Sequence, residues 1–250
     1  MILAIETATV ACSVAVAAPD GRLLAEINAP AGPAHTQRLL ADVHHALGMA
    51  GAQAADVRTV VVGLGPGTFT GLRIGVATAR ALAQAVGARL VGVPTLAGLA
   101  LALAEGDAAA KATALVALID GKRSEVFAAC YLRAAGYAVH CASDERAPAL
   151  DLVRGPAVVP AAELQAFLSP WPTAIVGGDG AHLYAAELPA GAHLARWVTA
   201  PSAAMILRAW EACSPGIVQG ADEVLPIYGR APDAQRWTAR TASTSGGGGT

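Results

Sequence analysis

The chain has 250 residues, of which 54% are hydrophobic and 14% charged, enough apolar material for one large domain or two lobes of about 100 residues each. Its net charge is −2 and its lysines and arginines are scattered, which argues against a chain that grips a nucleic-acid backbone by itself. No apolar stretch reaches the ~20 residues that span a bilayer, and the four cysteines show no CxxC pairing. A soluble cytoplasmic protein with reduced thiols is expected.

The first part of the chain predicts three strands and then an alternation of helices and strands. Apolar runs bounded by turn residues such as Pro19-Asp20-Gly21 indicate the strands. The expected elements are strands at 2–6, 11–18 and 22–29, a helix at 34–49, a strand at 59–64, a helix at 70–86, a strand at 89–93 and a helix at 95–104.

The helix at 34–49 has a clear amphipathic pattern. Its predicted apolar face carries Leu39, Leu40, Val43 and Leu47. The adjacent histidines 44 and 45 diverge by about 100° around the helix axis and belong to its polar face. They are therefore expected to be solvated and not to bind a metal.

The same order of elements begins again after Gly106. The expected elements are strands at 114–120 and 124–132, a weaker third strand near 136–141, a helix near 160–168, a strand at 173–177, a helix from about 180, a strand near 194–198 and a helix at 202–213. The opening strand of each half ends in an acid, Glu6 in the first and Asp120 in the second.

Two βββαβαβα lobes in tandem, with mixed sheets covered by helices, are typical of the α/β superfamily of actin, sugar kinases and heat-shock chaperones (ASKHA). The predicted division is a first lobe at 1–106, a second lobe at 107–230 and a disordered tail at 231–250. The tail is assigned from its low-complexity composition.

The run GLGPGTFTGLRIG, from Gly63 to Gly75, follows a strand and opens a helix. It is not a P-loop because no lysine lies between Gly63 and Gly87, and it lacks both the third glycine and the later acid of a dinucleotide fingerprint. A helix N-terminus can still attract an anion. The candidate nucleotide or anion site comprises Glu6, Thr7, Gly67, Thr68 and Asp120.

The helix that follows this run is apolar or small over most of its circumference. Its polar stripe is only about 60° wide, whereas a helix lying on a sheet usually shows water a broad polar face. Small residues recur every four positions, and Gly75 costs roughly 1 kcal/mol of helix propensity relative to alanine. Two explanations remain open, burial within its own lobe or close packing against another protein. The predicted partner interface comprises Thr70, Gly71, Leu72, Ile74, Gly75, Thr78, Ala79 and Leu82.

The sequence GPGTFTGLRIG, together with the opening ILAIETATVACSVAV, resembles the TsaB family, also called YeaZ. The usual run of the family is GPGSFTGLRIG, so Thr68 replaces a serine. His35 followed by Leu39-Leu40 is similar to a His-then-LLP pattern of the family, without its proline.

The resemblance continues into the second half of the chain. Asp120, Glu125 and Val126 match a D-A-R-x-x-E-V-Y block, with departures at positions 121, 122 and 127. Pro226, Tyr228 and Arg230 match a terminal P-x-Y-L-R, with glycine in place of the leucine. The likeness covers roughly residues 1–230.

The resemblance implies a non-catalytic role in making threonylcarbamoyladenosine in tRNA. Its implied partner is a TsaD-like protein, which transfers threonylcarbamoyl from an adenylate to N6 of the adenosine beside the anticodon. Helices of the first lobe would form the dimer interface, and a TsaE-like ATPase would complete the assembly. Transfer RNA would bind only to the complex, and the partners would use the ATP. This chain would bind no cofactor tightly. A homodimer of the isolated chain is left open.

Two catalytic alternatives are weighed against this role. A small-molecule kinase or ATPase of the same fold would use the strand-end acids Glu6 and Asp120 for Mg²⁺ and base chemistry. A TsaD-like metallopeptidase would need an H-x-x-x-H pair, and no two of the six histidines have that spacing. We therefore expect no catalytic residue and no metal ligand in this chain.

Overall fold

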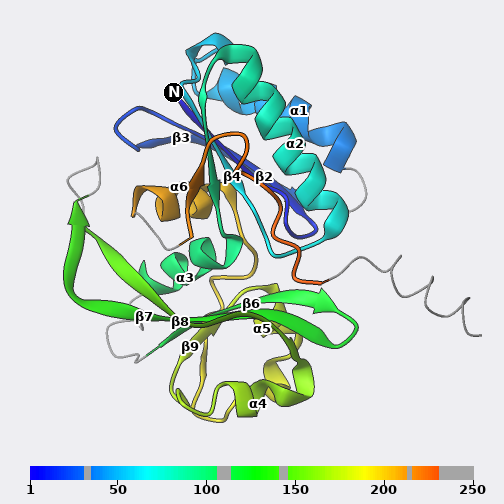
Figure 1. Ribbon diagram of the computed structural model, residues 1–250, viewed down its shortest axis with the longest axis vertical. Helices are drawn as coiled ribbons and strands as arrows, with labels where there is room; N and C mark the ends of the chain where they lie inside the picture. Colours follow the sequence, from blue (N-terminus) through cyan, green and yellow to red (C-terminus); the bar gives the residue numbers. More distant parts are fainter. Residues whose placement is uncertain (31–34, 106–113, 141–145, 213–215, 231–250) are drawn as a thin grey trace, which may run out of the picture.

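The structure, a computed structural model, describes residues 1–30, 35–105, 114–140, 146–212 and 216–230. It consists of two sheets with helices between and outside them (Figure 1). The helices and strands in chain order are β1 (Ile2–Glu6), β2 (Ala11–Ala17), β3 (Leu23–Pro30), α1 (His35–Met49), β4 (Thr59–Gly63), α2 (Phe69–Val86), β5 (Arg89–Val93), α3 (Thr95–Glu105), β6 (Leu115–Lys122), β7 (Glu125–His140), β8 (Arg146–Pro160), α4 (Leu164–Phe167), β9 (Ile175–Gly177), α5 (Asp179–Leu183), β10 (His193–Leu194), α6 (Ala203–Glu211) and β11 (Val218–Gln219).

Both sheets are mixed and have the same connectivity. The first sheet has the order β11-β5-β4-β1-β2-β3, and the second has the order β10-β9-β6-β7-β8. In each, the first three strands pair antiparallel and the next two add in parallel. The predicted order βββαβαβα is thus confirmed in both halves, and the fold is α/β of the ASKHA type.

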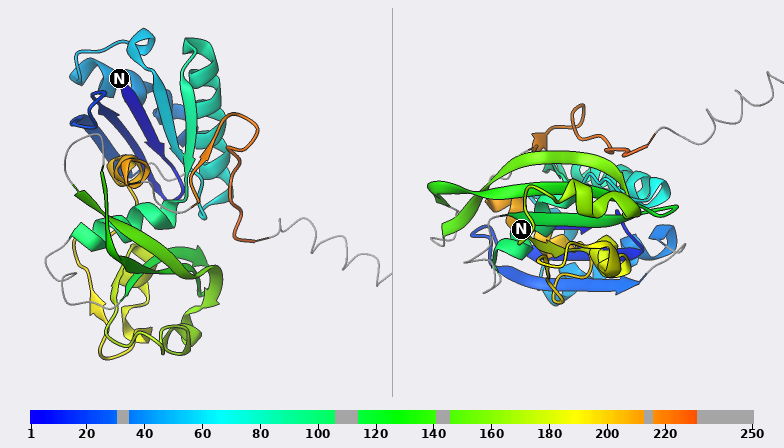
Figure 2. Two further views of the ribbon diagram at one scale, coloured as in Figure 1. Left: turned by 60° about the vertical axis from the view of Figure 1, so that its left-hand side comes forward. Right: turned by 90° about the horizontal axis from the view of Figure 1, so that it is seen from below.

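The closing helices α3 and α6 lie between the two sheets (Figure 2). Helix α3 follows the first sheet in sequence but packs on β6, while α6 packs on β1 and β4 of the first sheet, and the two helices contact each other. Strand β11 also returns to the first sheet, where it pairs with β5. The division of the chain at residue 106 remains a prediction, because the two halves exchange elements across this layer.

Three apolar cores follow from this stacking. The central core joins alternate residues of both sheets to α3 and α6, and it includes Ala4, Leu99, Ile119 and Ile206. A second core lies between the first sheet and the pair α1 and α2, and a third lies beneath α4 and α5. Strand β1 contributes to two of them because successive side chains of a strand point to opposite faces.

Two expectations from the sequence are wrong in detail, and one short strand was not predicted. Residues 136–140 continue β7, and the third strand of the second sheet is β8, which contains Pro148 and Pro156. Prolines are tolerated there because β8 is an edge strand. Strand β11 is only two residues long and has no pattern of its own. On α1, Leu39 is buried as expected, but Leu40 is 59% exposed.

Candidate functional site

The glycine loop between β4 and α2 serves the protein's own backbone. A side chain at Gly67 would collide with the carbonyl oxygen of Ala8, in the loop that joins β1 to β2. The next residue, Thr68, donates its backbone N–H to that same oxygen at 2.7 Å. Gly65 has φ +96°, a left-handed conformation that favours glycine. These contacts account for the glycines without a phosphate.

The small residues of α2 face the same loop. A side chain at Gly71 would meet the carbonyl oxygen of Thr7, and one at Gly75 would meet the Thr7 hydroxyl. That hydroxyl donates a hydrogen bond of 2.8 Å to the carbonyl oxygen of Gly71, and Thr7 is fully buried. The glycines therefore allow the loop after β1 to lie directly on the helix.

This burial corrects half of the predicted partner interface. The inner face of α2, which lies against the protein's own first lobe, consists of Gly71, Leu72, Gly75, Val76, Ala79 and Ala83. Four predicted interface residues, Gly71, Leu72, Gly75 and Ala79, belong to it, and a partner cannot reach them. The prediction fails there because helix periodicity shows which residues share a face but not what covers that face.

The opposite side of α2 is open to solvent. Its outer face consists of Thr70, Arg73, Ile74, Ala77, Thr78, Ala81, Gln84 and Ala85, all exposed or half-buried. The predicted interface residues Thr70, Ile74 and Thr78 lie here. Ile74 and the predicted residue Leu82 are half-buried, and both also pack against the second core. Their role in binding a partner remains a prediction.

Glu6 is enclosed where β1 ends. Its side chain is 1% exposed, and one carboxylate oxygen accepts a hydrogen bond from the backbone N–H of Ala8 at 2.6 Å. The other oxygen accepts one from the hydroxyl of Thr95 at 2.8 Å, and that hydroxyl accepts one from the N–H of Gly65 at 3.0 Å. Burial raises the pKa of Glu6 to about 7, although these hydrogen bonds oppose the rise.

Asp120 has a different environment at the equivalent strand end of the second lobe. Its carboxylate accepts hydrogen bonds from the backbone N–H of Lys122 at 2.8 Å and from the Lys122 ammonium at 2.6 Å. The bond to Asp120 raises the pKa of Lys122. The N–H of Asp120 donates to the carboxylate of Asp179 at 3.0 Å, and burial raises the pKa of Asp179.

The structure therefore brings together only part of the candidate nucleotide or anion site. Four of its residues meet around the loop after β1: Glu6, Thr7, Gly67 and Thr68. Hydrogen bonds join this loop to the glycine loop and to the start of α2. The recorded hydrogen bonds of Asp120 all lie within the second lobe.

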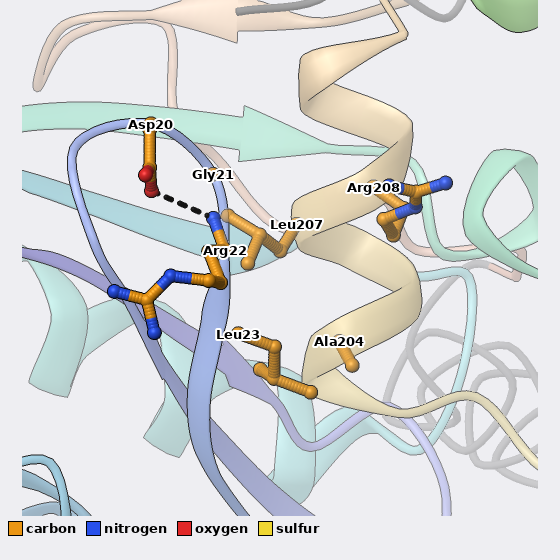
Figure 3. Close-up of a pocket in the computed structure, with 7 residues that line it drawn as sticks. All are labelled: Asp20, Gly21, Arg22, Leu23, Ala204, Leu207 and Arg208. Atoms are coloured by element: carbon orange, nitrogen blue, oxygen red, sulfur yellow. Dashed lines mark hydrogen bonds between the residues drawn. The ribbon is translucent and has the colours of Figure 1, made fainter. Parts of the chain in front are cut away.

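Two cavities lie on the other side of the first sheet, along α6. One of about 380 Å³ is lined by the turn between β2 and β3 and by Arg208, and in it the N–H of Arg22 donates to Asp20 at 3.1 Å (Figure 3). The other, of about 410 Å³, is lined by residues of α3 and α6 and by Trp197. Neither cavity is lined by a predicted site residue.

The remaining expectations concern metals, thiols and membranes. Among the residues that the structure describes, no three histidine, cysteine or acidic side chains are grouped to hold a metal ion. Cys12 and Cys130 are free and buried, while Cys141 and Cys213 lie outside the described residues, as does the predicted tail at 231–250. Within the same described ranges, no helix has the length and apolar character to cross a membrane.

Comparison with known proteins gives a consistent set of relatives. A family model described as TsaD, tRNA N6-adenosine threonylcarbamoyltransferase, matches residues 29–167. The tRNA threonylcarbamoyladenosine biosynthesis protein TsaB of Escherichia coli K12 is 40% identical over 133 residues, which are 53% of this chain and 55% of that protein. The protein of the same name from Haemophilus influenzae is 33% identical over 126 residues, 50% of this chain and 51% of the relative. The chain thus spans about half the length of these curated relatives.

Solved structures extend the match over nearly the whole chain. YeaZ from Pseudomonas aeruginosa is 30% identical, superposes with a TM-score of 0.69, and the match covers 91% of this chain and 98% of that one. The overall fold described above therefore belongs to a known architecture. The family model, the named relatives and the solved YeaZ structure agree, and the chain belongs to the TsaB family, also called YeaZ.

Proposed function

We propose that this chain is a non-catalytic subunit in the synthesis of threonylcarbamoyladenosine in tRNA. It pairs with a TsaD-like protein, which transfers the threonylcarbamoyl group to N6 of the adenosine beside the anticodon. The names of the relatives support the pathway, and the matching TsaD family model is consistent with pairing between related folds.

The observation that carries the non-catalytic role is the enclosure of Glu6. A carboxylate that binds Mg²⁺ must present oxygen atoms to the ion, and a general base must reach its substrate. Both oxygens of Glu6 already accept hydrogen bonds from Ala8 and Thr95, and the side chain is 1% exposed. Asp120, the other acid expected in a kinase, is paired with Lys122. This arrangement favours a structural use of both acids.

The outer face of α2 is the proposed surface for the TsaD-like partner. Ala77, Ala81 and Ala85 recur every four residues along it and are exposed. Such a row of small side chains lets a second helix approach at the short end of the usual 8–10 Å spacing. Isolated copies of the chain would self-pair through the same face.

The proposal assigns the remaining chemistry to other members of the assembly. A TsaE-like ATPase uses the ATP, tRNA is held by the complex as a whole, and this chain binds no cofactor tightly. Its own contribution is to hold the partner in an active arrangement through the interface.

A reconstitution tests the proposal. Threonylcarbamoyl transfer to tRNA from the threonylcarbamoyl adenylate is measured with this chain alone, with the TsaD-like protein of the same organism alone, and with both. We expect transfer to need the TsaD-like protein and to rise when this chain is added. Glu6→Gln and Asp120→Asn should leave that rise intact. Transfer by this chain alone, or ATP hydrolysis that either variant abolishes, would contradict the non-catalytic role.

A further inference from the structure

The last described residues of the chain cross from one lobe to the other. We define residues 226–230 as the interlobe strap. Just before the strap, Val224 is fully buried in the second core, so the chain is already anchored to the first lobe. The strap then passes the start of α2 and reaches the tip of the β6–β7 hairpin (Figure 1).

The first half of the strap is bound to the first lobe. The N–H of Ile227 donates to the carbonyl oxygen of Leu64 at 2.7 Å. The ring of Tyr228 lies 5.0 Å from that of Phe69, the first residue of α2, with a tilt of 37°. Arg73, one turn along, places its guanidinium 3.8 Å from the centre of the Phe69 ring and donates from Nε to the Tyr228 hydroxyl at 3.0 Å. The ring contact and the hydrogen bond of Tyr228 thus join the strap to the first turn of α2, and the guanidinium of Arg73 also lies 5.9 Å from the centre of the Tyr228 ring.

The second half of the strap is bound to the second lobe. A side chain at Gly229 would collide with the ring of Phe127, so the backbone passes directly over that ring. Arg230 forms an ion pair with Glu125, and its guanidinium also donates to the carbonyl oxygen of Lys122 at 3.3 Å. Four consecutive residues, 227–230, therefore link the two lobes.

The hairpin that Arg230 holds has an unusual backbone. Lys122, Arg123 and Ser124 have φ values of 62°, 57° and 58°, three successive left-handed residues with none of them glycine. L-residues rarely adopt this conformation in series, and it persists only when the surrounding structure fixes it. The contacts that fix it include the bond from Arg230 to Lys122 and a bond of 2.8 Å from the N–H of Ala161 to the carbonyl oxygen of Ser124. Within the hairpin, Lys122 also donates to the carboxylate of Asp120 from its backbone N–H and from its ammonium.

We propose that the interlobe strap couples this strained hairpin to the first turn of α2, so that release of Arg230 relaxes the hairpin and loosens the end of α2 that borders the outer face. The coupling sets how well the outer face binds its partner, and this last step rests on the function proposed above. Arg73, Tyr228 and Arg230 are positioning residues in this scheme. Because coupling free energies are reciprocal, disturbance at α2 must also reach the hairpin.

Hydrogen exchange on the full chain tests the coupling without a partner. In Arg230→Ala, we expect exchange to rise at least about threefold both at the hairpin, residues 119–127, and at the start of α2, residues 66–76, because the ion pair with Glu125 is lost. In Arg73→Ala, exchange should rise at the hairpin as well. Arg230→Lys keeps the charge opposite Glu125 and should restore part of the protection.

The matched control is Arg154→Ala. This arginine also lies in the second lobe, donates to the carbonyl oxygen of Phe167 and stacks on that ring at 4.4 Å, but it does not touch the strap. Its removal should raise exchange only within the second lobe. If Arg230→Ala changes the hairpin and leaves residues 66–76 as protected as in the wild type, the coupling is refuted. A folded Arg230→Ala chain with no change at either segment refutes it as well.

The affinity for the TsaD-like protein tests the last step. Arg230→Ala should weaken binding at least about threefold, while Arg154→Ala should not. Coupled exchange with unchanged affinity would overturn the claim that the strap tunes the partner surface. If the wild-type chain does not bind the TsaD-like protein at all, the proposed function fails, and the exchange measurements still decide whether the strap couples the lobes.

Discussion

The two faces of α2 both contain small residues, but the inner face is buried and the outer face is exposed. On the inner face, glycines at 71 and 75 allow the loop after β1 to lie on the helix, and Thr7 bonds to the helix backbone. On the outer face, Ala77, Ala81 and Ala85 are exposed. Contacts within the chain explain the small residues of the inner face. We propose that contact with a partner explains those of the outer face.

Gly75→Leu gives a large expected effect on the stability of the chain. The leucine gains up to about 1 kcal/mol of helix propensity, but it enters the space of the buried Thr7, and the lost Thr7 contacts add to an overpacking cost of about 1–3 kcal/mol. We expect a net loss of about 2 kcal/mol, which lowers the melting temperature by roughly 4–8 °C in a chain of this size. Thermal unfolding followed by circular dichroism measures it.

Ala77→Leu is the matched control for this comparison, because it adds a leucine to the exposed side of the same helix. Its melting temperature should stay within about 2 °C of the wild type. Equal melting of Gly75→Leu and the wild type would show that the inner face is not packed as described.

Glu6→Gln should flatten the pH dependence of the unfolding free energy. Burial raises the folded-state pKa of Glu6 to about 7 from an ordinary 4.5, so the folded chain holds this proton more tightly than the unfolded chain. The resulting stability is complete below pH 4.5 and is lost as the pH rises to about 7, a change of roughly 3 kcal/mol. Urea unfolding at pH values between 4.5 and 8 measures the slope.

Glu211 contributes to the same pH window, since burial also raises its pKa to about 7, so the informative quantity is the difference between the wild type and Glu6→Gln. Glu187→Gln, an exposed change in the second lobe, should keep the wild-type slope. An unchanged slope in Glu6→Gln would mean that this carboxyl group is not enclosed as the structure has it.

Thr7→Val gives a smaller expected effect on the inner face. The valine matches the shape of threonine but cannot donate to the carbonyl oxygen of Gly71, and a net loss of about 1 kcal/mol is expected. Thr70→Val is the control, because Thr70 is exposed on the outer side of the same helix turn. The two variants are compared by urea midpoint, and equal midpoints would contradict the role of the Thr7 hydrogen bond.

The sequence could predict the order of elements because apolar periodicity records which residues face a core. Strand β8 was not predicted because Pro148 and Pro156 interrupt its pattern. Strand β11 was not predicted because two residues are too few to show a periodic pattern. The sequence also could not show that α3 and α6 exchange lobes, because packing between distant segments leaves no local pattern.

The candidate site was predicted in part for the same reason. Glu6, Thr7, Gly67 and Thr68 do meet, since strand ends and the loops that follow them share one edge of the sheet. Which side of α2 a partner could reach could not be predicted, because the four-residue spacing of Gly71, Gly75 and Ala79 is equally consistent with an internal and an external neighbour. The roles of Arg73 and Arg230 could not be predicted either, because the strap brings them together only in the folded chain.

The most direct test of the central claim is the affinity of the chain for its TsaD-like partner when one face of α2 is altered at a time. Sedimentation velocity gives the dissociation constants for the wild type, Ala81→Arg on the outer face and Thr7→Val on the inner face, at a temperature where all three are folded. We expect Ala81→Arg to weaken binding at least about tenfold, because an unpaired charge would be buried in the contact, and Thr7→Val to stay within about threefold of the wild type. Equal binding by Ala81→Arg and the wild type would contradict the assignment of the outer face as the partner surface.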